Sequence, residues 1–174
     1  GWEIPKYEKQ TTDKKIIVFN HRPHAYKNYP WFLKQMDKLW KKRKDFEVWV
    51  PLADKIEREY MTNDKYDRVG YFSKLSSCRL GVCAKQKYSG WAVSATDGMS
   101  VGVPYVFSDD DYYHELAGDD GIYYYDVDDA LIDTIEELLD SDSLRERYSK
   151  KALNRFEKGK WVTAINQFNN MFKE

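Results

Sequence analysis

Two cations in the first half of the sequence are spaced as a phosphate site would need them. Arg22 and Lys27 stand five residues apart, flanked by His21, His24 and Asn28. An arginine offers a planar fork of N–H donors that matches a phosphate group, and a lysine adds a mobile point charge. Together they could neutralise a departing diphosphate. The same spacing also fits two exposed cations on a loop, so the residues alone leave both interpretations open.

A second segment, residues 88–104, combines glycines with a carboxylate. Gly90 precedes an expected helix, where a ligand could approach free backbone N–H groups and the helix dipole favours phosphate. Asp97 follows about two helical turns later. Its carboxylate could accept hydrogen bonds from a ribose diol, and the alternative is a solvated helix residue. Gly102 and Pro104 then turn the chain into the next expected strand.

An alternation of strands and helices must position these residues. Short apolar, β-branched runs indicate strands, and apolar residues at helical spacing indicate helices. We expect strands over residues 14–20, 46–50, 68–70, 79–83, 104–107 and 122–125, and helices over 30–40, 71–77, 92–101, 112–116, 130–139, 141–156 and 160–172. This order predicts an α/β fold: a Rossmann-like parallel sheet with helices on both faces.

The domain organisation expected from this pattern is simple. Residues 1–13 form a polar lead-in, and residues 14–174 form one Rossmann-like domain. In such sheets ligands bind outside the carboxyl ends of the strands. We therefore expect the loops that follow Asn20, Gly70, Cys83 and Phe107 to lie at one edge and to contain the site.

Composition excludes several classes of protein. The 174 residues are 42% hydrophobic and 33% charged, which fits a globular domain and neither a disordered nor a fibrous chain. No apolar run is long enough for a membrane span, and residues 1–5 lack a signal-peptide pattern, so we expect a cytoplasmic protein without a transmembrane segment. Cys78 and Cys83 fit no metal or disulfide spacing, and we expect both to be reduced and structural.

Charge is segregated along the chain although its net value is −1. Residues 1–87 contain 20 Lys and Arg against 11 Asp and Glu, whereas residues 88–140 contain 14 Asp and Glu and no Lys or Arg. The basic half could contact phosphates locally, but Lys41, Lys42, Arg43 and Lys44 fit a solvated helix end better. The chain has neither a G-x-G-x-x-G sequence after its first strand nor a P-loop, which disfavours NAD- and ATPase-type sites.

The two loops together resemble a known family. The chain is similar to the C-terminal, nucleotide-sugar-binding domain of GT-B glycosyltransferases, especially the retaining group 1 (family 4) enzymes. That family has a G-R-x-x-x-x-K-G loop after the first strand of the domain, and Arg22 and Lys27 keep its spacing. Its second signature, E-G-F-G-x-x-x-x-E-A-M-A-x-G-x-P-V, is followed in order by Ser89-Gly90-Trp91-Ala92, Asp97-Gly98-Met99-Ser100, Gly102, Pro104 and Val106. The resemblance covers about residues 14–172.

The resemblance implies a role for each matching residue. Arg22 and Lys27 would hold the donor diphosphate and stabilise it as the leaving group, which is the catalytic role. Gly90 and Trp91 would present backbone N–H groups to the donor, and Asp97 would bind the ribose. The chemistry would be electrostatic and would require no metal or other cofactor. The donor would be a UDP-, GDP- or ADP-sugar, and a hexose would be transferred.

Other implications concern the rest of the donor and the acceptor. Val69, Gly70 and Tyr71 resemble the family's loop beside the nucleobase. Ser89 replaces the glutamate that contacts donor-sugar hydroxyls in the family, so it bears on sugar identity and on transfer itself. The acceptor, a carbohydrate or a modified DNA base, would be bound by an N-terminal GT-B domain that this chain lacks. The isolated domain would then bind donor with little or no transfer.

Three alternatives remain at this stage. Asp109-Asp110-Asp111, with His114 nearby, could be a metal-binding D-x-D motif of a GT-A glycosyltransferase, or simply an acidic helix start. The chain could also be a non-catalytic binding module on the same fold, presenting some of its 28 Trp, Tyr and Phe residues to a partner. Finally, the basic half could contact nucleic acid, although it contains no recognisable DNA-binding motif.

Overall fold

The computed structural model describes residues 4–88, 92–125 and 129–159. These residues contain a six-stranded sheet in the order β3-β2-β1-β4-β5-β6, in which every neighbouring pair is parallel. The strands are β1 (Lys15–Val18), β2 (Phe46–Trp49), β3 (Met61–Thr62), β4 (Leu80–Cys83), β5 (Tyr105–Ser108) and β6 (Ile122–Tyr124). The expected parallel α/β architecture is confirmed.

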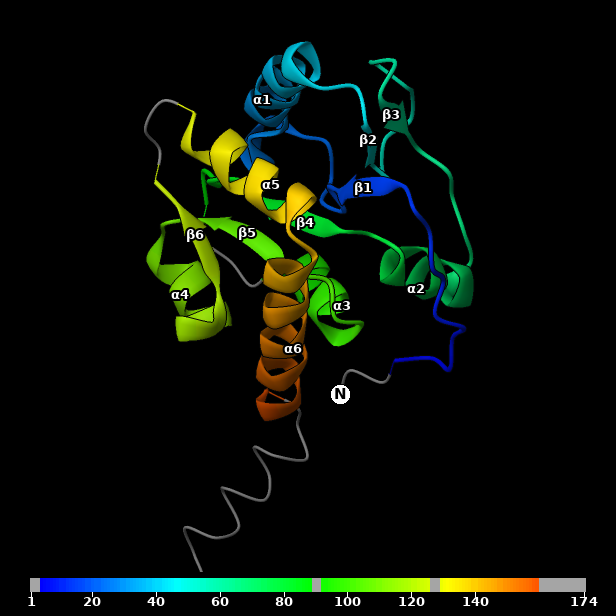
Figure 1. Ribbon diagram of the computed structural model, residues 1–174, viewed down its shortest axis with the longest axis vertical. Coiled ribbons are helices and arrows are strands. Elements are labelled where there is room, and N and C mark those ends of the chain that lie inside the picture. Colours follow the sequence, from blue (N-terminus) through cyan, green and yellow to red (C-terminus); the bar gives the residue numbers. More distant parts are fainter. Residues whose placement is uncertain (1–3, 89–91, 126–128, 160–174) are drawn as a thin grey trace, which may run out of the picture.

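Helices cover both faces of the sheet. They are α1 (Tyr29–Lys42), α2 (Arg68–Ser76), α3 (Val93–Ser100), α4 (Asp111–Ala117), α5 (Ala130–Asp140) and α6 (Asp142–Lys158), with short 3-10 turns at Ala25–Lys27 and Gly118–Asp120. Helices α1 and α5 bury their apolar stripes on one face, and α2, α3, α4 and α6 pack against the other (Figure 1). Within the described residues, no helix combines the length and apolar character that crossing a membrane would need.

One expected strand is wrong and another was missed. Residues 68–70 are not a strand but the first turn of α2, because Asp67 caps the helix and accepts a 2.7 Å hydrogen bond from the Gly70 N–H. The strand at this edge of the sheet is β3, only two residues long and flanked by polar residues, so its sequence carries no β periodicity. The helix expected over residues 160–172 lies outside the described residues.

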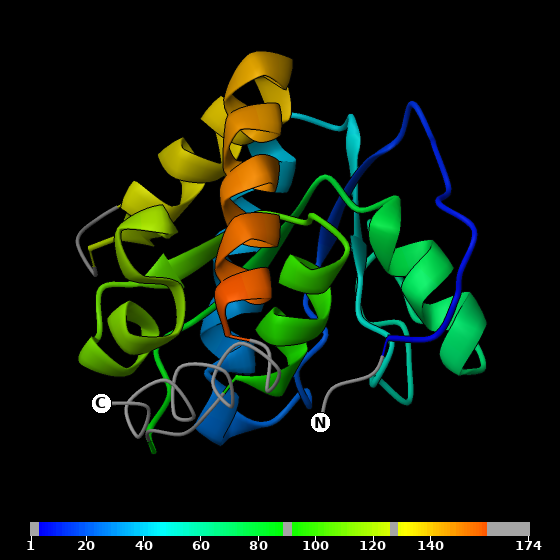
Figure 2. The same ribbon diagram turned by 90° about the horizontal axis from the view of Figure 1, so that it is seen from below.

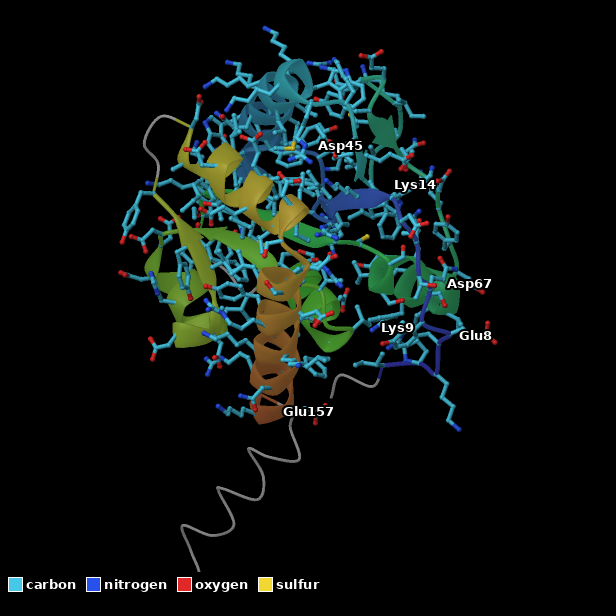
Figure 3. The ribbon with its side chains drawn as sticks, in the orientation of Figure 1. Glu8, Lys9, Lys14, Asp45, Asp67 and Glu157 are labelled. Atoms are coloured by element: carbon cyan, nitrogen blue, oxygen red, sulfur yellow. The ribbon has the colours of Figure 1, made fainter. Side chains whose placement is uncertain are left out.

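Residues 4–10 of the lead-in run along α2 (Figure 2). The Ser73 hydroxyl donates to the Glu8 carbonyl at 2.8 Å, and the Gln10 N–H donates to the Ser76 hydroxyl at 3.1 Å. The side chains of Glu8 and Lys9 lie beside the same helix (Figure 3). This part of the lead-in is therefore bonded to the domain.

Some of the oppositely charged residues of the two segments pair with one another between α1 and α5. Lys38 pairs with Asp129 at 2.7 Å, and Lys42 pairs with Glu136 at 3.4 Å. Arg43 binds Asp140 at 2.7 Å, in a cluster that also includes Lys15 and Asp45. Part of the basic charge of the first half is thus paired with the acidic segment.

Candidate functional site

A cleft of about 520 Å³ opens at the carboxyl ends of β1 and β2, beside the start of α3. Its lining comes from the segment after β1 (Asn20, His21, Arg22, Tyr26, Lys27), the turn after β2 (Pro51, Leu52), α2 (Tyr71) and the start of α3 (Ala92, Val93, Ser94, Asp97). The fold therefore brings Arg22, Lys27 and Asp97 together, although up to 75 positions separate them in the sequence. A cleft at this edge of a parallel sheet is where such folds bind ligands.

The two cations of the cleft differ in their surroundings. Arg22 is exposed, whereas the Lys27 ammonium is partly buried and donates to Oε1 of Gln86. Gln86 is itself buried and donates to the Tyr113 hydroxyl at 2.6 Å. Burial lowers the pKa of Lys27, and the nearby Arg22 charge lowers it further. Neither cation forms an ion pair within the described residues, so a bound anion would stabilise both charges.

The loop that presents these cations depends on an unusual backbone conformation. Asn28, directly after Lys27, has a φ of 55° and is the only described non-glycine residue with positive φ. It ends the 3-10 turn that carries Lys27 and begins α1. Asparagine tolerates this left-handed conformation better than other residues with a Cβ, and the family motif has glycine at the same place. The substitution therefore preserves the geometry of the loop.

The start of α3 faces the cleft and has no side-chain cap among the described residues. Its N-cap, Ala92, offers no side-chain hydrogen bond, and the first turn has no acidic residue. Ala92, Val93 and Ser94 all line the cleft. Backbone N–H groups at such an uncapped start favour an anion electrostatically. Ser89, Gly90 and Trp91, the other residues expected here, lie outside the described residues.

Asp97 is held at the edge of the cleft by a tyrosine. The Tyr71 hydroxyl donates to Oδ2 of Asp97 at 3.3 Å. Burial raises the pKa of Asp97 to about 6, although the Tyr71 hydrogen bond and the Arg68 charge act in the opposite direction. The charged carboxylate consequently has too few hydrogen-bond donors around it. This is expected of a carboxylate that accepts hydrogen bonds from the hydroxyl groups of a ligand.

Buried polar groups fix the floor of the cleft. The Asn20 amide donates to the Tyr71 hydroxyl at 2.9 Å and to the Ser94 carbonyl at 2.8 Å. The fully buried Tyr105 hydroxyl donates to Oδ1 of Asn20 at 2.9 Å. This network connects the end of β1 to α2, α3 and β5, so the elements that carry Arg22 and Asp97 are mutually anchored.

Tyr105 reaches this floor only because two glycines leave room for its ring. A Cβ on Gly81 would lie 2.3 Å from Cε1 of Tyr105, and a Cβ on Gly98 would lie 2.2 Å from Cε2. Gly98 occupies the position of the alanine in the family's E-A-M segment. The glycine and the large aromatic residue are therefore a matched pair.

Val69 and Gly70 do not lie in a loop, because they belong to the first turn of α2. Tyr71, one residue later, is the α2 residue that lines the cleft. The expectation of a loop at these positions is wrong, and a contact of Val69 or Gly70 with the base stays a prediction.

Sequence reasoning assigned no role to three polar residues that complete the site: Asn20, Ser94 and Gln86. Asn20 and Ser94 are close in sequence to the predicted motif residues, and this closeness could have indicated that they belong to the site. Gln86 belongs to no motif, because its role depends on a contact with the distant Lys27.

The acidic turn after β5 makes local contacts. Asp109 binds His114 at 2.6 Å, Asp110 accepts from the Ser108 hydroxyl at 2.5 Å, and Asp111 begins α4. Among the described residues there is no group of three His, Cys, Asp or Glu side chains that could hold a metal ion.

The fold and the cleft define an α/β domain with an anion-attracting site at the carboxyl edge of its parallel sheet. Residues 2–155 match the family model of glycosyl transferases group 1. The chain belongs to this family, which is a family of glycosyltransferases. No curated protein gave a significant sequence match.

Solved structures with the same fold are GT-B glycosyltransferases. TarM from S. aureus, in a complex with fondaparinux, alpha-GlcNAc-glycerol and UDP, superposes with a TM-score of 0.77 at 19% identity, over 99% of this chain and 38% of TarM. A UDP-forming trehalose-phosphate synthase from Burkholderia vietnamiensis gives 0.71 at 10% identity, over 91% of this chain and 45% of the synthase. The C-terminal domain of the group 1 protein LpcC from Francisella tularensis gives 0.66 at 16% identity, over 86% and 87%. The chain thus spans less than half the length of TarM and of the synthase.

Proposed function

We propose that this domain binds the nucleoside diphosphate part of a nucleotide-sugar donor in the 520 Å³ cleft. The observation that carries the proposal is the convergence of Arg22, Lys27 and the uncapped start of α3 on one cavity. All three favour an anion, and two cations with a row of N–H groups match a diphosphate better than a single carboxylate. UDP in the TarM complex supports a nucleotide as the ligand class, and a UDP-, GDP- or ADP-sugar as the donor.

Different residues of the cleft would bind different parts of the donor. Arg22 would bind one phosphate through two N–H groups. Lys27, which is hydrogen-bonded to Gln86, would contact the other phosphate. Asp97 would accept hydrogen bonds from the ribose hydroxyls. As the sugar departs, negative charge grows on the diphosphate and is met by cations and dipoles already in place, so this stabilisation needs no metal.

The complete reaction is proposed for a longer protein. We infer that an N-terminal domain outside this chain binds the acceptor, a carbohydrate or a modified DNA base, and that a hexose is transferred with retention. The isolated domain would then bind donor but transfer little. The partial coverage of TarM and the synthase supports a missing second domain. A cytoplasmic location stays a prediction.

Calorimetric titration of the chain with UDP, GDP and ADP and their glucose conjugates, in EDTA, tests the proposal. We expect one nucleotide to bind without metal, and Arg22→Ala to weaken binding by about 1.5–3 kcal/mol. Arg147→Ala is the matched control, because Arg147 is exposed on α6 and does not line the cleft. Equal affinity of the wild type and Arg22→Ala would remove the assigned role.

The same titration separates the alternatives. Binding that requires magnesium or manganese and is lost in Asp109→Asn would favour the acidic turn after β5. Binding without any transfer by the full-length protein would favour a non-catalytic module, a possibility raised by Ser89 in place of the family's glutamate.

A further inference from the structure

The lysine of the cleft is bonded to a buried side chain that does not itself line the cleft. Lys27 donates from Nζ to Oε1 of Gln86, which is 8% exposed. The segment that carries Gln86 is also bonded to the turn that carries Lys27, because the Lys87 N–H donates to the Tyr26 carbonyl at 3.0 Å. Any effect of the Gln86 side chain on a ligand in the cleft must therefore pass through Lys27.

The orientation of the Gln86 amide follows from its two partners. An ammonium group only donates hydrogen bonds, so the amide oxygen must face Lys27 and the amide nitrogen must serve the second partner. That partner is the Tyr113 hydroxyl, which accepts from Nε2 of Gln86 at 2.6 Å. The hydrogen of the Tyr113 hydroxyl then goes to the Ala84 carbonyl at 3.1 Å. Burial raises the pKa of Tyr113, so this hydrogen is kept at neutral pH.

These bonds form a chain in which every donor points the same way. It runs from the Lys27 ammonium through Gln86 and Tyr113 to the Ala84 carbonyl, directly after β4. The Gln86 backbone N–H adds a 3.0 Å bond to the Tyr112 hydroxyl, which also belongs to α4. A flipped amide would set donor against donor at Lys27, so the chain has a single arrangement. The position of the ammonium is thus fixed by α4 and by the end of β4.

A neutral acceptor suits this place better than a charged one. An ammonium has three N–H groups, so the bond to Gln86 leaves two of them for a ligand. Burial lowers the pKa of Lys27, and a hydrogen bond accepted from its charged form acts in the opposite direction. The amide does this without cancelling the positive charge. A carboxylate at the same place would form an ion pair with Lys27 and repel a diphosphate.

We propose that Gln86 is a positioning residue of the donor site, which fixes the Lys27 ammonium where a phosphate of the nucleoside diphosphate binds and is itself fixed by Tyr113. The proposal rests on the proposed function, because it needs a diphosphate in this cleft. Without its anchor, the long side chain of Lys27 would sample several rotamers. Binding would then have to order that side chain, and the ordering would reduce the affinity.

Calorimetric titration with UDP, or with whichever of GDP and ADP the wild type prefers, tests two substitutions of Gln86. Gln86→Met keeps the length of the side chain and removes the acceptor, so it should weaken binding about threefold to tenfold. Gln86→Glu keeps an acceptor but pairs with the charge, so it should weaken binding at least about tenfold. Gln35→Met is the matched control, because Gln35 is a buried glutamine of α1 that does not line the cleft. Its nucleotide affinity should equal that of the wild type.

A double-mutant cycle shows whether Gln86 acts through Lys27. In a Lys27→Met background, Gln86→Met should change the affinity by less than about twofold. Tyr113→Phe removes the partner of the amide nitrogen and keeps the ring, so it should weaken binding about twofold to threefold with Lys27 present and not in the Lys27→Met background. Additive effects of Gln86→Met and Lys27→Met would mean that Gln86 supports the fold rather than the lysine, and would overturn the proposal.

Nitrogen-15 NMR of the lysine ammonium groups reports the bond directly. A hydrogen-bonded ammonium exchanges its hydrogens slowly with water, and Lys27→Met identifies the signal of Lys27 by its loss. We expect that signal in the wild type and in Gln86→Glu, but not in Gln86→Met. A signal that is unchanged in Gln86→Met would contradict the anchoring of Lys27 by Gln86.

The outcomes are distinguishable from those of the proposed function. Binding by the wild type and its loss in Arg22→Ala, with wild-type affinity in both Gln86 variants, would overturn the role of Gln86 and leave the donor site standing. Failure of the wild type to bind UDP, GDP or ADP at all would overturn both.

Discussion

Replacement of Asp97 by asparagine should make the domain more stable at neutral pH and a weaker nucleotide binder. The carboxylate is partly buried beside the Tyr71 hydroxyl, and burial raises its pKa from 3.8 to about 6. Folding therefore favours the protonated form of Asp97. This contribution to stability is complete below about pH 3.8 and is lost as the pH rises through about 6. Asparagine is neutral at every pH and avoids that loss.

The size of the effect follows from the same values. A rise of the pKa from 3.8 to about 6 corresponds to about 3 kcal/mol at neutral pH. Solvent reaches part of the carboxyl, so we expect a stabilisation of about 1–2 kcal/mol. For a chain of this length that gain is a rise in Tm of about 2–8 °C. Nucleotide affinity should fall about 10-fold, because a charged acceptor for the ribose hydroxyls is lost.

Urea unfolding at pH 7.5 and pH 3.5 measures the stability term, and calorimetric titration measures the affinity. The free energy of unfolding of Asp97→Asn should exceed that of the wild type at pH 7.5, and the difference should shrink at pH 3.5. Asp54→Asn is the control, because its side chain is 100% exposed and its substitution should change stability by less than about 0.5 kcal/mol. The assignment of a carboxylate destabilised by burial would be refuted if Asp97→Asn were less stable than the wild type at pH 7.5. It would also be refuted if the two proteins differed in free energy of unfolding by the same amount at both pH values.

Other substitutions test the scaffold around the cleft. Gly98→Ala should cost about 1–3 kcal/mol in the free energy of unfolding, because its Cβ would lie 2.2 Å from the Tyr105 ring. In a Tyr105→Val background, Gly98→Ala should be neutral or stabilising. The measurement is a double-mutant cycle of urea unfolding midpoints, and additive effects of the two substitutions would contradict the interpretation of Gly98 and Tyr105 as a matched pair. Asn28→Ala should cost about 1 kcal/mol, because its φ is 55°, whereas Asn28→Gly should be nearly neutral. Equal thermal midpoints for these two variants would argue against a left-handed loop.

The parallel sheet was predictable chiefly because β1, β2 and β4 are short, mainly apolar runs that each follow a charged residue: Lys14, Asp45 and Arg79. Ile16, Ile17 and Val18 in β1 are almost fully buried, as such a run requires. β3 could not be recognised in this way, because a strand of two residues is too short to show a pattern of apolar residues. The strand predicted at Val69 and Gly70 was wrong for a related reason. A β-branched residue before a glycine resembles the end of a strand, but the Asp67 side chain caps a helix that begins at residue 68.

The candidate site was predictable in outline and not in its contacts. Arg22, Lys27 and Asp97 carry charges at motif spacing, and the rule that ligands bind at the carboxyl ends of parallel strands placed them together. The bond between Lys27 and Gln86 joins residues 59 positions apart and has no sequence signature. Long-range partners of this kind depend on how the helices pack, which no local pattern encodes.

A crystal structure of the chain with UDP, GDP or ADP, grown in EDTA with whichever nucleotide binds, tests the central claim most directly. The account predicts the diphosphate between Arg22, Lys27 and the first turn of α3, with the ribose hydroxyls on Asp97. A nucleotide seated outside this cleft, or one whose phosphates touch neither cation, would contradict it.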